Sequence, residues 1–186
     1  MDEDTIFDHM DEQTQKAIDH AIHEFASVNT GKANPSMVED VMVEAYGGMM
    51  ALKELSAIST PDARTIAVQP WDKTVLKAVE KAVQSANLGI TPVIVGDVVR
   101  LPLPELTRER RQELAKLAHK YAEEAKVGVR KGRHDAMDAM KKRQKQGEIT
   151  EDDLKRNEKE IQNKTDTAVK KIDELLAAKE SDLLTV

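Results

Sequence analysis

The chain has 186 residues, of which 33% are charged and 40% hydrophobic, enough apolar material for one domain or two small ones. It contains no cysteine, which excludes disulfides, thiolate metal sites and cysteine nucleophiles, and only 3% aromatics, which leaves little scope for stacking on nucleic-acid bases. No apolar run approaches the ~18 residues of a membrane span, and the acidic start Met-Asp-Glu-Asp is unlike a targeting signal, so a cytoplasmic protein is expected.

Residues 4–29 are predicted to form a helix, because apolar side chains recur there at a three-four spacing. The predicted stripe consists of Phe7, Met10, Thr14, Ala17, Ala21, Phe25 and Val28. Gly31 and Pro35 follow the stripe and end the helix.

Residues 37–105 change to short β-rich runs separated by turn residues, with one amphipathic helix among them. The predicted strands are residues 42–45, 55–59, 65–68, 93–95 and 98–101, and residues 60–62 are interpreted as a turn. The helix begins after Asp72 as its N-cap, ends before Gly89, and buries Val75, Leu76, Val79, Ala82, Val83 and Ala86. Trp71, directly before Asp72, is interpreted as a packing or helix-entry residue rather than a binding platform.

Residues 107–146 return to a helical pattern with a seam close to a heptad repeat. The predicted seam consists of Leu114, Leu117, Tyr121, Ala125, Gly128, Gly132, Ala136 and Ala139. Glycine inside a helix costs ~1 kcal/mol relative to alanine, so the two seam glycines indicate close approach of another helix. Thr150 and Asp153 resemble a capping box that opens a last helix, ending near residue 182.

Three long helices, each with a narrow apolar stripe, predict an α+β fold in which an elongated three-helix bundle carries an inserted small α/β domain. The expected bundle comprises residues 1–30 and 106–186, and the expected insert residues 31–105. Proline stiffens both connections, so hinges are expected near residues 30–35 and 100–105; the prolines are Pro35, Pro102 and Pro104.

The charge is unevenly distributed. Residues 107–147 hold thirteen basic and six acidic side chains, although the whole chain carries −6. At ~100° per residue, the basic side chains expected on one outward face of this helix are Lys126, Arg130, Arg133 and Lys141. Such a face suits phosphate groups. The competing interpretation is a solvated face that pairs with acidic neighbouring helices.

With these residues in view, the sequence resembles the bacterial ribosome recycling factors over essentially the whole chain. The resemblance rests on residues 30–36 (TGKANPS), 62–66 (DARTI), 87–90 (NLGI), 99–104 (VRLPLP), 106–111 (LTRERR) and 129–136 (VRKGRHDA). Order and spacing also agree with the helix–insert–helix–helix plan. The ordered set is more specific than any single motif.

The resemblance implies an L-shaped factor that binds the ribosome after termination through large-subunit ribosomal RNA. With elongation factor G and GTP, such a factor dissociates the subunits; it performs no chemistry itself and needs no cofactor. By position, Arg110, Arg130 and Arg133 match RNA-contacting arginines of the family. The segments containing Thr30, Gly31, Lys32 and Pro35, and Arg100, Pro102 and Pro104, match its elbow, and the small domain would face elongation factor G.

Some positions depart from the family pattern. Asn29 and Lys32 stand where arginine is common, and His134 follows Arg133 where a second arginine is frequent. Gly132 and Glu105 are also atypical. Fewer guanidinium groups imply weaker phosphate binding with a smaller salt dependence.

Three alternatives stay open. The same fold could serve a ribosome-binding anti-association or hibernation factor, and the heptad-like seams also suit a coiled-coil interaction scaffold, although a monomer is expected. An enzyme is least favoured, because no convergent acid, base or nucleophile is evident. His20 and His23 lie three residues apart but lack a third ligand nearby, so no metal site is predicted.

Overall fold

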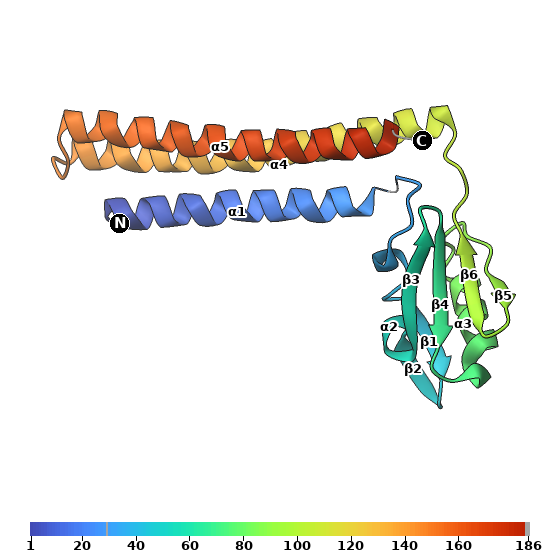
Figure 1. Ribbon diagram of the computed structural model, residues 1–186. Coiled ribbons are helices and arrows are strands. Elements are labelled where there is room, and N and C mark those ends of the chain that lie inside the picture. The colour runs from blue at the N-terminus through green and yellow to red at the C-terminus, as the bar shows by residue number, and fades with distance from the viewer. Residues whose placement is uncertain (29, 185–186) are drawn as a thin grey trace. The chain divides into compact units, whose positions relative to one another are not determined.

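We describe the chain from a computed structural model covering residues 1–28 and 30–184 (Figure 1). It divides into two compact units, Met1–Thr30 with Arg108–Val186, and Gly31–Thr107. None of the helices among the described residues has the length and apolar character needed to cross a membrane. Asn29, one of the departures from the family pattern, lies outside the described residues.

The first unit is the predicted three-helix bundle. Its helices are α1 (Glu3–Ser27), α4 (Arg108–Lys145) and α5 (Glu151–Leu184). Two apolar clusters lie along their shared core. One cluster consists of Ala21, Phe25, Ala118, Ala122, Ala125, Val129, Ala168, Ile172 and Leu176, and the other of Ile6, Met10, Ala136, Met140 and Ile161. Small side chains therefore dominate the first cluster, which is typical of helices that pack closely.

The buried arc of α4 is displaced from the predicted seam. The structure buries Leu114, Ala118, Ala122, Ala125, Val129, Gly132, Ala136 and Met140. Leu117, Tyr121, Gly128 and Ala139 are only partly buried. At ~100° per residue, the centre of the buried arc lies roughly 50° from the predicted direction. The prediction followed the larger side chains, whereas the centre of the contact with two neighbours holds alanine and valine.

The helix ends of the bundle are capped as their sequences indicate. Asp2 accepts a hydrogen bond from the Thr5 backbone N–H at 2.8 Å. Before α5, the Thr150 N–H donates to Asp153 Oδ2 and the Asp153 N–H donates to Thr150 Oγ1, both at 3.1 Å. The predicted capping box is therefore confirmed. Gly147, between α4 and α5, has φ +72°, a left-handed conformation that suits glycine.

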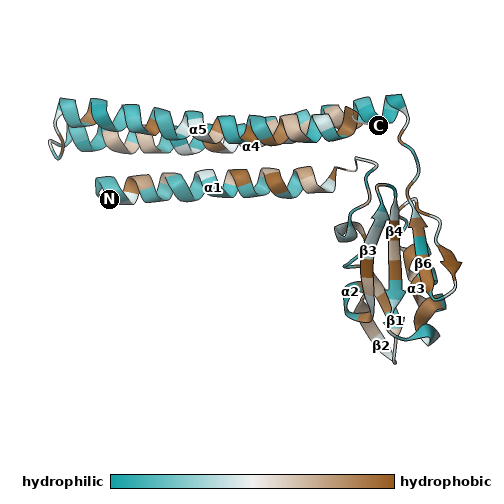
Figure 2. Cartoon of the chain, viewed as in Figure 1, coloured by the Kyte–Doolittle hydropathy of each residue, from teal (hydrophilic) through white to brown (hydrophobic). Residues whose placement is uncertain are grey.

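The second unit contains two antiparallel sheets. The hairpin of β1 (Met42–Ala45) and β2 (Gly48–Ala51) forms one sheet. The other has the order β3-β4-β6-β5, with bounds Ser56–Asp62 for β3, Thr65–Pro70 for β4, Val93–Val95 for β5 and Val98–Pro102 for β6. In Figure 2, β5 at the edge of this sheet is hydrophobic over its length.

Four short helical segments complete the second unit. They are η1 (Pro35–Met37), α2 (Leu52–Leu55), η2 (Lys73–Val75) and α3 (Leu76–Ser85). Asp72 caps η2, which leads into α3, by accepting from the Thr74 N–H. The core is made of branched aliphatic side chains, among them Val38, Val43, Leu52, Leu55, Ile66, Val68, Val79, Val83, Val99 and Leu101.

Several sequence predictions for this unit need correction. Ala86, predicted to be buried by the helix, is exposed at the end of α3. Strand β3 continues through residues 60–62, which were predicted as a turn. Strand β2 was missed, because its sequence Gly-Met-Met-Ala lacks the alternation that indicates a strand. Trp71 is 72% exposed and is therefore not a packing residue, while its place directly before the N-cap Asp72 agrees with the helix-entry alternative.

Candidate nucleic-acid interface

The edge of α4 that faces α1 is made of small residues. A Cβ atom added at Gly128 would lie 3.2 Å from Ala17 Cβ, and one at Gly132 would lie 3.2 Å from Gln13 Oε1. Both distances are tighter than ordinary van der Waals contact. The predicted reason for the two glycines, close approach of another helix, is therefore confirmed.

Lys126 lies on the opposite edge of α4, against α5, and not on the outward face where it was predicted. Its side chain is only 14% exposed, and its Nζ lies 2.6 Å from Asp173 and 3.5 Å from Glu123. The hydrogen bond to Asp173 is the main cause that raises the pKa of Lys126. The charge of Lys126 is thus compensated within the bundle.

Arg133 occupies the same α5-facing edge, two turns further along. It is partly buried, and its Nε donates a hydrogen bond to Gln162 Oε1 at 2.8 Å. It too departs from the predicted outward face, because the buried arc of α4 is turned toward these positions. Unlike Asp173, however, Gln162 is neutral, so the hydrogen bond leaves the charge of Arg133 uncompensated.

The other candidate side chains point out of the bundle. Arg130 and Lys141 are exposed and make no hydrogen bond or ion pair with any residue that the structure describes. Arg110, near the start of α4, is exposed and its Nη1 lies 2.9 Å from Glu113. The predicted RNA-binding residues therefore differ in their surroundings. Arg110, Arg130 and Lys141 are exposed, Arg133 is oriented by the neutral Gln162, and the charge of Lys126 is compensated by Asp173. Sequence spacing did not reveal this difference.

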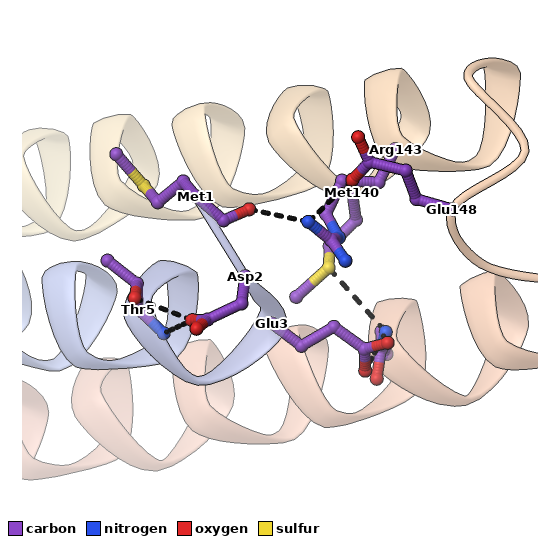
Figure 3. A network of polar contacts seen from close by, with 8 residues as sticks. Met1, Asp2, Glu3, Thr5, Met140, Arg143 and Glu148 are labelled. Atoms are coloured by element: carbon purple, nitrogen blue, oxygen red, sulfur yellow. Dashed lines mark hydrogen bonds and ion pairs between the residues drawn. The ribbon is translucent and has the colours of Figure 1, made fainter.

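His134 and Arg143 add little to this surface. His134 is exposed and its Nε2 lies 3.2 Å from Asp138 Oδ2. Arg143 is turned inward at the end of the bundle, where its Nη1 donates to the Met1 carbonyl at 2.7 Å and lies 2.6 Å from Glu148 (Figure 3). Its role is to fix the start of α1 onto α4.

Sequence reasoning missed Gln162 and Asp166 on α5. Gln162 contacts Arg133, and Gln162 Nε2 in turn donates to Asp166 Oδ1 at 2.8 Å. No motif singles out these two side chains, because Arg133, the residue that Gln162 contacts on α4, is 29 residues away in the sequence. Only their spacing of four residues, which suits a hydrogen bond along one helix, could have suggested a pair.

The predicted hinge residues lie near the two ends of the second unit, where the chain enters it after Thr30 and leaves it before Arg108. Thr30 belongs to the first unit and Gly31 to the second. Gly31 has φ +77°. Pro35 opens η1, Arg100 lies within β6, and Pro102 ends that strand. Lys32 and Pro104 are exposed.

Both connections are held by the turn between β3 and β4. The Ala33 N–H donates to the Ala63 carbonyl and the Leu103 N–H to the Arg64 carbonyl, each at 2.7 Å. The Arg64 side chain also forms an ion pair with Glu105 at 2.7 Å. Residues 31–33 and 103–105 are thus integral to the small domain, and the atypical Glu105 has a structural partner.

A second exposed feature lies on the small domain. Tyr46 is 68% exposed, adopts φ +52°, and donates its hydroxyl to Asp72 Oδ2 at 3.0 Å. This bond and the charge of Asp72 raise the pKa of Tyr46, while the bonds from Thr74, chiefly its backbone N–H, lower the pKa of Asp72. Trp71, directly before Asp72, is also exposed. We call Tyr46 and Trp71 the aromatic pair.

Across residues 1–28 and 30–184, no group of three histidine, aspartate or glutamate side chains is placed to hold a metal ion. His20 and His23 are both exposed on α1, as expected of a surface pair.

Comparison with known proteins agrees with the sequence resemblance. The family model described as "Ribosome recycling factor" matches residues 21–184. A ribosome-recycling factor of Bradyrhizobium sp. strain BTAi1 is 52% identical over 164 residues, covering 88% of each chain, and one of Bradyrhizobium diazoefficiens is 51% identical over 172 residues, covering 92% of each.

Solved structures give the same result. A solution structure of a ribosome recycling factor has a TM-score of 0.79 and 35% identity, covering 100% of this chain and 99% of that one. A T. thermophilus ribosome recycling factor, described together with E. coli elongation factor G bound to the E. coli post-termination complex, has a TM-score of 0.68 and 37% identity, covering both chains fully. With its bundle, inserted sheet domain and matching sequence, this chain belongs to the ribosome recycling factor family.

Proposed function

We propose that this chain binds the post-termination ribosome through large-subunit ribosomal RNA and, with elongation factor G and GTP, dissociates the ribosome into subunits. The observation that carries the proposal is the pair Arg130 and Arg133 on α4, neither compensated by an acidic partner among the described residues. Three residues apart, they lie ~4.5 Å from one another along the helix axis. Guanidinium groups bind phosphate through paired hydrogen bonds, which gives both affinity and a fixed orientation.

The uneven charge supports one orientation on RNA. Residues 1–30, which include α1, hold eight acidic residues and one basic residue, so this side of the bundle repels phosphate groups. Residues 107–147 carry the excess of positive charge. The protein can therefore bind RNA through α4 despite a net charge of −6.

The small domain supplies the surface for elongation factor G in this proposal. Aromatic side chains are enriched in protein interfaces. Both members of the aromatic pair are exposed, and Tyr46 is held in place by its hydrogen bond to Asp72. The family comparison supports the choice of partner, since a relative is described with elongation factor G on a post-termination complex. The GTP is hydrolysed by that partner, and this chain contributes no catalytic group.

The two connections transmit the action of elongation factor G to the bundle. The β3–β4 turn holds both connections through Ala33, Leu103 and the Arg64–Glu105 ion pair. We place the hinge at the unit boundaries next to these anchored segments, at residues 30–31 and 107–108.

Light scattering tests this function directly. Post-termination ribosomes are mixed with the protein, elongation factor G and GTP, and we expect a fall in scattering that requires all three additions. A fall without elongation factor G would instead support an anti-association factor. No fall in any mixture, combined with a salt-resistant oligomer that ignores ribosomes in sedimentation, would support a scaffold.

A further inference from the structure

We propose that Gln162 on α5 is a positioning residue for Arg133, and that it orients the guanidinium group for phosphate without cancelling its charge. This inference rests on the proposed function, because it assumes that Arg133 binds ribosomal RNA. It assigns part of the RNA-binding surface to α5, which supplies no phosphate contact of its own in the proposal.

The geometry is a relay of two hydrogen bonds, one across the α4–α5 contact and one along α5. Arg133 Nε donates to Gln162 Oε1, and Gln162 Nε2 donates to Asp166 Oδ1, each at 2.8 Å. Because the amide oxygen and the amide nitrogen both have partners, the orientation of the Gln162 amide is fixed. Both Arg133 and Gln162 are partly buried, which restricts their side chains further.

The relay uses the one guanidinium N–H that bidentate binding does not require. Apart from the bond at Nε, Arg133 makes no hydrogen bond or ion pair with the residues that the structure describes. The two Nη atoms together carry four N–H donors, a fork that matches two phosphate oxygens. Phosphate binding at Arg133 is therefore compatible with an intact relay.

Comparison with Lys126 shows why a neutral partner matters. Lys126 contacts the same helix, α5, through Asp173, and that carboxylate compensates its charge. Gln162 accepts from Arg133 in an equivalent position but carries no charge. One contact stabilises the bundle, whereas the other holds a cation and keeps its charge available to RNA.

The expected benefit is entropic. A long side chain that is already ordered loses less freedom when it binds, which improves affinity without a new contact. For one arginine side chain this corresponds to about 3- to 10-fold in affinity. Arg130 has no such partner among the described residues, so the benefit is specific to Arg133.

The test is a double-mutant cycle on the affinity for vacant bacterial 70S ribosomes, measured over a range of salt concentrations. Gln162→Met removes the hydrogen bonds at similar length, and we expect about 3- to 10-fold weaker binding with an unchanged salt slope. Arg133→Ala should weaken binding and reduce the slope by about 0.7–0.9, the contribution of one phosphate contact. Adding Gln162→Met to Arg133→Ala should then have no further effect.

Gln15 offers a matched control. Its Nε2 donates to Asp19 Oδ1 at 2.8 Å, the same hydrogen bond along a helix, but on α1 and with no arginine attached among the described residues. Gln15→Met should leave ribosome binding unchanged. Gln162→Glu is a second variant that keeps the acceptor but adds a compensating charge, and it should reduce both the affinity and the salt slope.

The possible outcomes distinguish a failure of this inference from a failure of the proposed function. If Gln162→Met weakens binding equally in the Arg133→Ala background, Gln162 acts by another route and the inference is wrong. If Gln162→Met has no effect while Arg133→Ala does, the inference fails and the proposed function survives. If Arg133→Ala itself leaves affinity and slope unchanged, the proposed RNA-binding face fails.

Discussion

The two units of the molecule are built from different side chains. Alanine and glycine fill much of the bundle interior, where α1 lies against Gly128 and Gly132, while valine, leucine and isoleucine form the core of the small domain. Their exposed features differ as well. The bundle displays uncompensated arginines and the small domain displays the aromatic pair. We infer that the bundle is suited to RNA and the small domain to protein.

Reversing one charge on the bundle should have the largest effect. Arg133→Glu removes a phosphate-binding fork and adds repulsion, so we expect ribosome affinity to fall at least about 100-fold while helicity by circular dichroism stays unchanged. Lys16→Glu on α1 makes the same change in net charge at a side chain that is 73% exposed, and should leave affinity within about twofold. Equal losses in both variants would show that total charge, and not the α4 face, governs binding.

Adding volume between α1 and α4 should destabilise the bundle alone. Gly128→Ile places a branched side chain against Ala17 on a rigid helix, and we expect the free energy of unfolding to fall by about 1–3 kcal/mol in urea denaturation. At Gly132→Ala the one tight contact is with Oε1 at the far end of the flexible Gln13 side chain, and the Met10 carbonyl lies at an ordinary 3.9 Å. Helix propensity should therefore raise stability by up to about 1 kcal/mol. The interpretation of close packing would be wrong if Gly128→Ile were as stable as the parent.

Removing the exposed tryptophan should weaken the action of elongation factor G without changing ribosome affinity. Because Trp71 contributes no buried surface to the core, Trp71→Ala should preserve folding and ribosome affinity. We expect the rate of subunit dissociation at limiting elongation factor G to fall about 10-fold, as for a central interface aromatic. Leu88→Ala, which truncates another exposed apolar side chain of the small domain, is the control. If Trp71→Ala dissociates subunits at the same rate as the parent chain, the surface for elongation factor G does not include Trp71.

The capping box should give the smallest effect, and one that depends on pH. The Thr150 backbone bond, chiefly, lowers the pKa of Asp153 in the folded state. Its contribution is therefore present above the unfolded pKa near 4 and is lost as the pH falls through the lower folded value. Asp153→Ala should lower the thermal midpoint by about 2–4 °C at pH 7.

That difference between the parent and Asp153→Ala should shrink below pH 4. Asp153→Asn, which accepts the same bond without titrating, should lower the midpoint less at pH 7 and show no such loss in acid. A difference between parent and Asp153→Ala that is constant from pH 7 to pH 2 would contradict the role of the carboxylate.

The sequence predicted helix ends and element order better than helix faces. Local signals such as Asp72 and the Thr150–Asp153 box act within a few residues, and the structure bears them out. The face of α4 depends instead on two neighbouring helices, which turned Lys126 and Arg133 toward α5. Exposure of Trp71 also depends on tertiary packing, which no local pattern encodes.

The most direct test of the central claim is the salt dependence of binding to 70S ribosomes for the parent chain and the Arg130→Ala/Arg133→Ala variant. If both guanidinium groups contact phosphate, the slope of log affinity against log salt concentration should decrease in magnitude by about 1.4–1.8. An unchanged slope, with or without a loss of affinity, would contradict the assignment of this α4 surface to ribosomal RNA.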